Sequence, residues 1–111
     1  RSLSEGKIDD WLYVNGIVHA YEKTIIMQDG KKLIPDWYIP PNAMPNSHKV
    51  YIEFWGRPKD PKYMKDKEKK LENYKKLGII DQIISLEPKH LSDLDSYLGR
   101  FLSRVANLQV R

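Results

Sequence analysis

Two acidic residues, Asp36 and Glu53, stand where the surrounding sequence is largely apolar. Asp36 directly follows Pro35 in an extended stretch, and Glu53 lies inside the apolar segment of residues 49–55. If the two segments pair as strands, the carboxylates lie close together and repel each other, and a divalent cation relieves that repulsion. Taken singly, each acid is more simply a surface residue, because exposed acids are the norm. The pair together favours a metal site built from oxygen ligands.

The composition of the chain narrows the chemistry that is open to it. Its 111 residues are 41% hydrophobic and include no cysteine, so we expect one core without disulfides, thiolate metal ligands or a cysteine nucleophile. His19, His48 and His90 show no spacing typical of metal ligands. No apolar run has the length of a membrane helix or the form of a signal peptide. We expect an intracellular protein, cytoplasmic or located in a nucleoid or nucleus.

Positive charge is concentrated in one segment of the chain. The formal net charge is +4, and lysine and arginine gather between residues 57 and 76. Such a segment fits the phosphate backbone of a nucleic acid. A solvated helix surface with salt bridges one turn apart is the more common explanation for a charge run alone.

Apolar periodicity and turn signals predict the elements that must position these residues. In chain order they are a helix up to Asn15, strands over residues 17–27, 33–39 and 49–55, a helix between Asp60 and Gly78, a strand over residues 79–86 and a helix over residues 91–108. Ser2 and Glu5 form a capping box at the start of the first helix. Asp60, followed by Pro61, is a typical start of the second.

The last predicted helix carries one apolar stripe. Its members recur in steps of three and four, and they are Leu91, Leu94, Leu98, Phe101, Val105 and Leu108. Core packing is the usual role of such a stripe. An interface, with a second copy of the chain or with a parent protein, is the alternative.

The strand and helix periods predict which side chains share a face with the acids. Glu53 shares its strand face with Tyr51 and Trp55. One stripe of the second helix holds two lysines and two aromatics that we expect to point inward, namely Tyr63, Lys67, Lys70 and Tyr74. Glu5 lies on an inward stripe of the first helix, so it is either a further acid of the site or only the capping partner of Ser2.

These residues together resemble the core of the PD-(D/E)XK nuclease superfamily. The likeness rests on Pro35-Asp36 and on Glu53-Phe54-Trp55 after an apolar strand, and with the order of elements it covers nearly the whole chain. It is closest to small domains similar to very-short-patch-repair and restriction endonucleases. The resemblance implies a single α/β domain over residues 1–111, with a restriction-endonuclease-like three-layer core in the order α-β-β-β-α-β-α around a central mixed sheet. The start at Arg1 suggests a domain excised from a larger protein.

The resemblance also implies an activity. Such a domain is a nuclease that hydrolyses phosphodiester bonds in DNA with Mg²⁺ or Mn²⁺, in DNA repair, recombination or restriction or as a helicase-associated module. Asp36, Glu53 and the backbone carbonyl of Phe54 would hold the metal, with help from Glu5. The side chains expected to contact DNA are Arg57, Lys59, Tyr63, Lys67, Lys70 and Tyr74.

One position departs from the superfamily pattern. The second residue after the glutamate is usually a lysine, and here it is Trp55. Since the chemistry requires only a cation near the attacking water and the phosphate, we expect a lysine of the second helix to replace it, Lys70 in first place and Lys67 in second. Lys69 lies on the outward face and is the expected control. Alternatively, both inward lysines lay their stems along the core edge and keep their amines in water.

The missing strand lysine leaves other functions open. A domain of the same fold could bind DNA or a protein without cutting. A third hypothesis is an interaction module whose last helix docks on a parent helicase or ATPase, or forms a homodimer. Metal-dependent cleavage separates the nuclease from the binding domain, and a mass measurement in solution tests the dimer.

Overall fold

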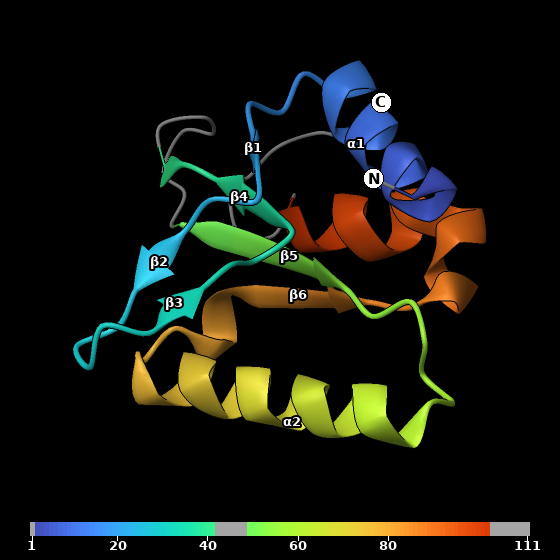
Figure 1. Ribbon diagram of the computed structural model, residues 1–111. Helices are drawn as coiled ribbons and strands as arrows, with labels where there is room; N and C mark the ends of the chain where they lie inside the picture. Colours follow the sequence, from blue (N-terminus) through green and yellow to red (C-terminus); the bar gives the residue numbers. More distant parts are fainter. Residues whose placement is uncertain (1, 42–48, 103–111) are drawn as a thin grey trace.

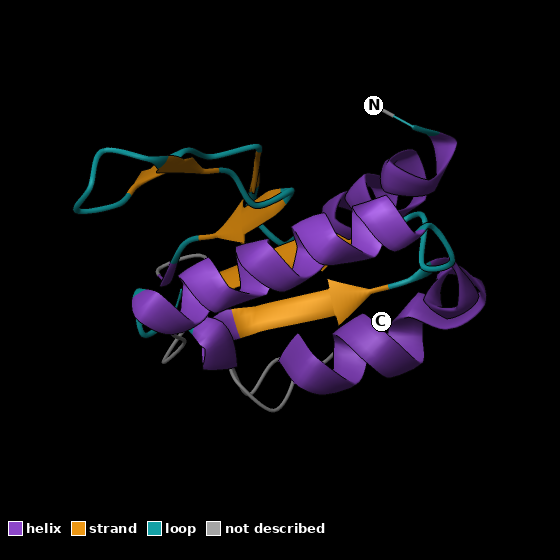
Figure 2. Ribbon diagram, turned by 60° about the horizontal axis from the view of Figure 1, so that its bottom comes forward, coloured by secondary structure: helices purple, strands orange, loops and turns teal. Residues whose placement is uncertain are grey.

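The computed structural model describes residues 2–41 and 49–102, and its centre is a mixed β-sheet (Figure 1). The helix α1 (Leu3–Val14) and a C-terminal helical segment, residues 88–102, pack on one face of this sheet. The helix α2 (Pro61–Lys76) lies along the other face (Figure 2). The chain is thus an α/β protein with a mixed sheet, as the sequence predicts.

Four strands form the central sheet, in the order β1, β4, β5 and β6. They comprise Ala20–Tyr21, Trp37–Ile39, Val50–Phe54 and Ile83–Leu86. β4 pairs antiparallel with β5, and β6 pairs parallel with β5 after the crossover through α2. β5 therefore lies inside the sheet, between β4 and β6, as its apolar sequence predicts.

The caps of both long helices follow the sequence signals. The N–H of Glu5 donates to Oγ of Ser2 at 3.1 Å, and the N–H of Ser2 donates to Oε1 of Glu5 at 3.2 Å, which completes the capping box of α1. Asp60 caps α2, and Gly78, whose φ is +75°, follows its end. Within the described ranges, no helix is long and apolar enough to cross a membrane.

Two predicted strands are each broken in two. Residues 17–27 form β1 and then β2 (Ile25–Ile26), because Glu22 adopts a left-handed φ of +57° that ends the first strand. Residues 33–39 form β4 after β3 (Lys32–Leu33), and Pro35 between them has no N–H to donate to a ladder. The prediction of continuous strands was therefore wrong. β2 and β3 pair with each other as a separate hairpin that extends away from the sheet (Figure 2).

The last part of the described chain is less regular than predicted. Residues 79–86 are only half strand, since the 3-10 turn η2 (Ile80–Gln82) precedes β6. The last predicted helix begins instead as the 3-10 helix η3 (Pro88–Asp93) and continues through a π-helical turn, η4 (Asp95–Gly99). The wider π turn adds a residue to that turn, so the buried positions no longer follow the predicted spacing. Val105 and Leu108 of the predicted stripe lie outside the described residues.

One cluster of buried side chains joins α1, the sheet and the C-terminal helical segment. Leu94, Leu98 and Leu102 are buried in this cluster, whereas Leu91 and Phe101 are partly buried against it. The predicted burial of Leu94 and Leu98 is confirmed. The apolar stripe thus packs in the core as far as the chain is described.

Leu98→Ala is expected to lower the free energy of unfolding by about 2 to 5 kcal/mol, because it leaves a cavity at a fully buried core position. Phe101→Ala should cost less, since this ring lies only partly inside the core. Unfolding in urea, monitored by circular dichroism, measures both. A Leu98→Ala protein as stable as the wild type would contradict the assignment of this segment to the core.

Candidate active site

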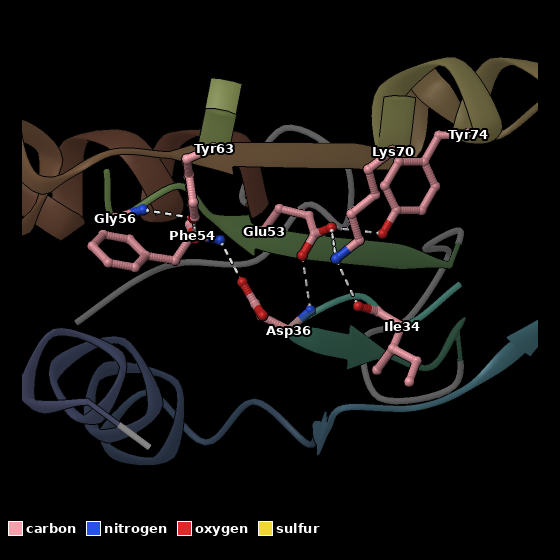
Figure 3. A network of polar contacts seen from close by, with 8 residues as sticks. All are labelled: Ile34, Asp36, Glu53, Phe54, Gly56, Tyr63, Lys70 and Tyr74. Atoms are coloured by element: carbon pink, nitrogen blue, oxygen red, sulfur yellow. Dashed lines mark hydrogen bonds and ion pairs between the residues drawn. The ribbon is translucent and has the colours of Figure 1, made fainter. Parts of the chain in front are cut away.

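Asp36 and Glu53 face each other at the end of the β4–β5 pairing. The register of Trp37 opposite Ile52 continues by one residue to place the two acids opposite each other. The N–H of Asp36 donates to Oε1 of Glu53 at 3.0 Å, and the N–H of Phe54 donates to Oδ2 of Asp36 at 2.7 Å (Figure 3). Each carboxylate thus accepts a backbone hydrogen bond from the other strand. The predicted proximity of the two acids is confirmed.

Glu53 is fully buried, with an exposed fraction of 0%. Its Oε2 accepts the hydroxyl of Tyr74 at 2.8 Å and lies 2.5 Å from Nζ of Lys70. A buried carboxylate is tolerated only when it is paired and hydrogen-bonded, and here both oxygens have donors. Tyr74 and Lys70 come from the inward stripe of α2. This helix therefore supplies both the hydroxyl and the ammonium that contact Glu53.

Lys70 reaches the acid pair, whereas Lys67 does not. Besides its ion pair with Glu53, Nζ of Lys70 donates to the carbonyl oxygen of Ile34 at 2.7 Å (Figure 3). Nζ of Lys67 instead lies 5.2 Å from the ring centroid of Trp55. The inward position predicted for Lys70 is confirmed, whereas the ammonium of Lys67 faces the ring of Trp55 and, among the described residues, forms no ion pair with the acids.

Trp55 occupies the position where the superfamily pattern has a lysine. Its ring is buried, and Nζ of Lys70 lies 5.8 Å from the ring centroid. Among the described residues, no acceptor lies within hydrogen-bond distance of its Nε1. The indole therefore lies beside the ammonium groups of both lysines.

Burial, followed by the charge of Glu53, raises the pKa of Asp36 from 3.8 to about 7. The hydrogen bond from the N–H of Phe54 and the charge of Lys70 oppose this shift, and the charge of Glu5 adds to it. The site thus holds two carboxyl groups and one ammonium, so the negative charge that forms when both acids ionise is only partly neutralised. A further cation would lower the pKa of Asp36 again.

The stability of the metal-free protein is expected to fall as pH rises from about 4 to about 7. The pKa of Asp36 is raised in the folded state, so the folded protein binds a proton more tightly than the unfolded chain, and this contribution is lost as pH passes the folded pKa of about 7. Because the carboxylate is half-buried, we expect roughly 1 to 3 kcal/mol. Urea unfolding of the wild type and of Asp36→Asn across this range measures the difference. Parallel curves for the two proteins would contradict the raised pKa.

Two tyrosines of α2 hold the backbone and the acid at this site. The hydroxyl of Tyr63 accepts the N–H of Gly56 at 3.0 Å and donates to the carbonyl oxygen of Phe54 at 3.4 Å. Burial is the main cause that raises the pKa of Tyr63 and of Tyr74, and the charge of Glu53 adds to both shifts. Both hydroxyls therefore keep their protons and act as donors.

The capping role that the sequence left open for Glu5 is confirmed, whereas its role as a further acid of the site stays a prediction. It is the capping partner of Ser2, and its Oε1 accepts the hydroxyl of Tyr21 at 3.4 Å. The charge of Glu5 contributes to the raised pKa of Asp36. Burial is the main cause that raises the pKa of Tyr21 to about 12, and the side chain of Glu22 and the charge of Glu5 add to this shift. Glu5 makes no hydrogen bond to Asp36 or Glu53 in the described part of the chain, so it acts on the pair only through its charge.

The other residues singled out from the sequence do not contact the acid pair in the described part of the chain. Arg57 and Lys59 are exposed in the loop between β5 and α2. His19 contacts Asp9 and the carbonyl of Ile17, and Nδ1 of His90 accepts the N–H of Glu87. Both histidines thus serve local contacts away from the acids, while His48 lies outside the described residues.

The donors at this centre suit a hard divalent cation. Asp36 offers its Oδ1, to which no described residue donates a hydrogen bond, whereas both oxygens of the buried Glu53 already accept donors that a metal ion would have to share or displace. The carbonyl of Phe54 accepts the hydroxyl of Tyr63 in a long contact of 3.4 Å. No group of three or more acids or histidines that could hold a metal is present in residues 2–41 and 49–102. The protein would therefore supply few ligands and leave the others to water and substrate, as is common for Mg²⁺.

Comparison of the chain with protein-family models, curated proteins and solved structures finds no significant match.

Proposed function

We propose that this chain is a metal-dependent deoxyribonuclease of the PD-(D/E)XK type, with a restriction-endonuclease-like core. The observation that carries the proposal is the pair of Asp36 and Glu53 across two strand ends, with the ammonium of Lys70 on the buried acid. The sheet order, the crossover helix α2 and the position of α1 are compatible with that core. In this interpretation the β2–β3 hairpin is an insertion between the first and second strands of that core, β1 and β4.

Asp36, Glu53 and the carbonyl of Phe54 would hold Mg²⁺ or Mn²⁺. When bound, such an ion offsets the charge of the carboxylates, polarises a phosphate and lowers the pKa of water. Lys70 adds a second positive charge beside the acids, where negative charge develops on a phosphate that is being cleaved. Glu53 and the carbonyl of Ile34 hold this ammonium in place before substrate arrives.

A second candidate function is DNA binding without cleavage. It is favoured by the complete pairing of Glu53, whose two oxygens already accept from Asp36, Tyr74 and Lys70, as in a purely structural network. The two functions predict different behaviour of the same protein toward DNA and metal. Neither depends on the C-terminal helical segment as a partner surface, because its leucines pack in the core.

The deciding experiment incubates the purified chain with end-labelled single-stranded and duplex DNA, in Mg²⁺, in Mn²⁺ and in EDTA. We expect shortened products only with a metal ion, and none with the Asp36→Asn variant. Binding of these DNAs without cleavage in either metal would overturn the nuclease and favour the binding domain. The variant also controls for a contaminating nuclease, since such an enzyme would survive the substitution.

A further inference from the structure

Two hollows lie between the β2–β3 hairpin and α2, and we call them together the hairpin groove. The first has a volume of about 370 Å³ and is lined by Lys32, Ile34, Asp66, Lys69, Lys70 and Asn73, among others. The second, of about 350 Å³, is lined by Met27, Asp29 and Lys76, among others, nearer the end of the helix. Figure 1 shows the hairpin beside the C-terminal half of α2.

The helix wall of the hairpin groove is one continuous stripe. Asp66, Lys69, Asn73 and Lys76 follow one another in steps of three and four, so they lie on one side of α2. At 1.5 Å per residue this stripe is about 15 Å long. That length matches about four stacked nucleotides of one DNA strand.

The charges of the hairpin groove suit a polyanion. Lys32, Lys69 and Lys76 are exposed, and none of them forms an ion pair with a described residue. Of the two acids in the lining, Asp29 lies 3.9 Å from Nζ of Lys31, which leaves Asp66 as the acid on the helix wall. Lysine side chains spaced along a groove bind successive phosphates without reading the bases.

The size of the hairpin groove selects one strand. Each part has the volume of a small-molecule pocket. A duplex is wider than its own major groove of about 12 Å, so we expect it to contact the exposed lysines from outside and not to enter hollows of this volume. Because Lys70 lines the groove and also forms an ion pair with Glu53, we expect a strand in the groove to reach the edge of the candidate active site.

We propose that the hairpin groove binds one DNA strand by its phosphates and leads this strand to Lys70 and the acid pair. The identification of the strand as substrate rests on the proposed function. The binding itself does not, because it needs neither metal nor cleavage. The substrate class that follows is DNA with a single-stranded stretch, such as a free end or a flap.

The test measures binding of a labelled oligothymidylate by fluorescence anisotropy in EDTA, where no cleavage occurs. The triple variant Lys32→Met, Lys69→Met, Lys76→Met should lose at least about tenfold in affinity, and the salt slope should fall by about 2, since each single-strand phosphate contact contributes about 0.7. The matched control, Lys7→Met, Lys65→Met, Lys75→Met, removes the same charge from exposed positions outside the groove. Equal losses in both triple variants, or no loss in either, would overturn the proposal.

A substitution of opposite sign sharpens the test. Asp66→Asn removes the acid from the helix wall and should tighten binding about threefold, while Glu68→Gln, at an exposed position of α2 outside the lining, should change it little. A blunt duplex that depends on the groove lysines as strongly as the oligothymidylate would overturn the assignment to one strand. If these binding effects appear and the chain cuts no DNA, the nuclease function is overturned, whereas binding of a strand in the groove is supported. If the chain cuts DNA and the groove variants bind it as tightly as the wild type does, only the proposal of strand binding in the groove is overturned.

Discussion

Asp36→Asn is expected to lower the rate of DNA cleavage by roughly a thousandfold or more and, at the same time, to stabilise the metal-free protein. The variant removes one of two charged ligands, and a metal ion contributes several kcal/mol to stabilising the charge that develops in phosphodiester cleavage. The amide keeps the size of the side chain, and its oxygen can still accept the N–H of Phe54. At about pH 8 the loss of an acid with a raised pKa should add roughly 1 to 3 kcal/mol to the free energy of unfolding.

Glu53→Gln distinguishes the roles of the two acids. It should abolish cleavage as Asp36→Asn does, but it should destabilise the protein. The fully buried Glu53 accepts three donors, and an amide leaves the ammonium of Lys70 without a charged partner. We expect a loss of about 1 to 3 kcal/mol. Neutralising an acid is therefore expected to preserve the fold at Asp36 alone. Steady cleavage by either variant would remove the proposed metal site.

Lys70→Met is expected to lower turnover by roughly a hundredfold, the effect of losing one electrostatic donor at the reacting phosphate. Binding of oligothymidylate in EDTA should fall far less, since one phosphate contact among several is lost. Single-turnover cleavage at saturating protein, together with anisotropy, separates the two effects. Mn²⁺ binding should persist, because Lys70 is not a metal ligand.

The matched control for Lys70 is Lys65→Met, on the outer face of α2. Lys69 is exposed, as the sequence predicts, but it lines the hairpin groove and is therefore no neutral control. Circular dichroism must show that Lys70→Met is folded, since Glu53 loses its cation. Equal losses of turnover in the Lys65 and Lys70 variants would mean that α2 acts only as a basic surface and that Lys70 has no specific role in cleavage.

Much of the site follows from local patterns. Alternation places Glu53 on the face of β5 that α2 covers, and antiparallel pairing brings Asp36 opposite to it. The helical period places Lys70 and Tyr74 on one inward stripe. These predictions hold because each depends on a period of two or of 3.6 within one regular element.

Other features depend on backbone conformations and packing that the sequence pattern does not specify. The left-handed φ of Glu22 is an uncommon state for a residue with a side chain, and no turn signal marks it. The carbonyl of Ile34 fixes Lys70, although any residue could supply a carbonyl there. The hairpin groove arises only because β2 and β3 leave the main sheet. Pro35, between β3 and β4, was the one sequence signal for that break.

The most direct test of the acid pair is a calorimetric titration of the wild type with Mn²⁺ at about pH 6 and about pH 8. We predict one saturable site per chain, tighter at the higher pH, because the raised pKa of Asp36 means that the metal must displace a proton. The heat should vary with the ionisation enthalpy of the buffer, as proton release requires. The same titration of Asp36→Asn should show no saturable site. Absence of binding to the wild type, or equal binding to the variant, would contradict the assignment of Asp36 and Glu53 as the metal centre.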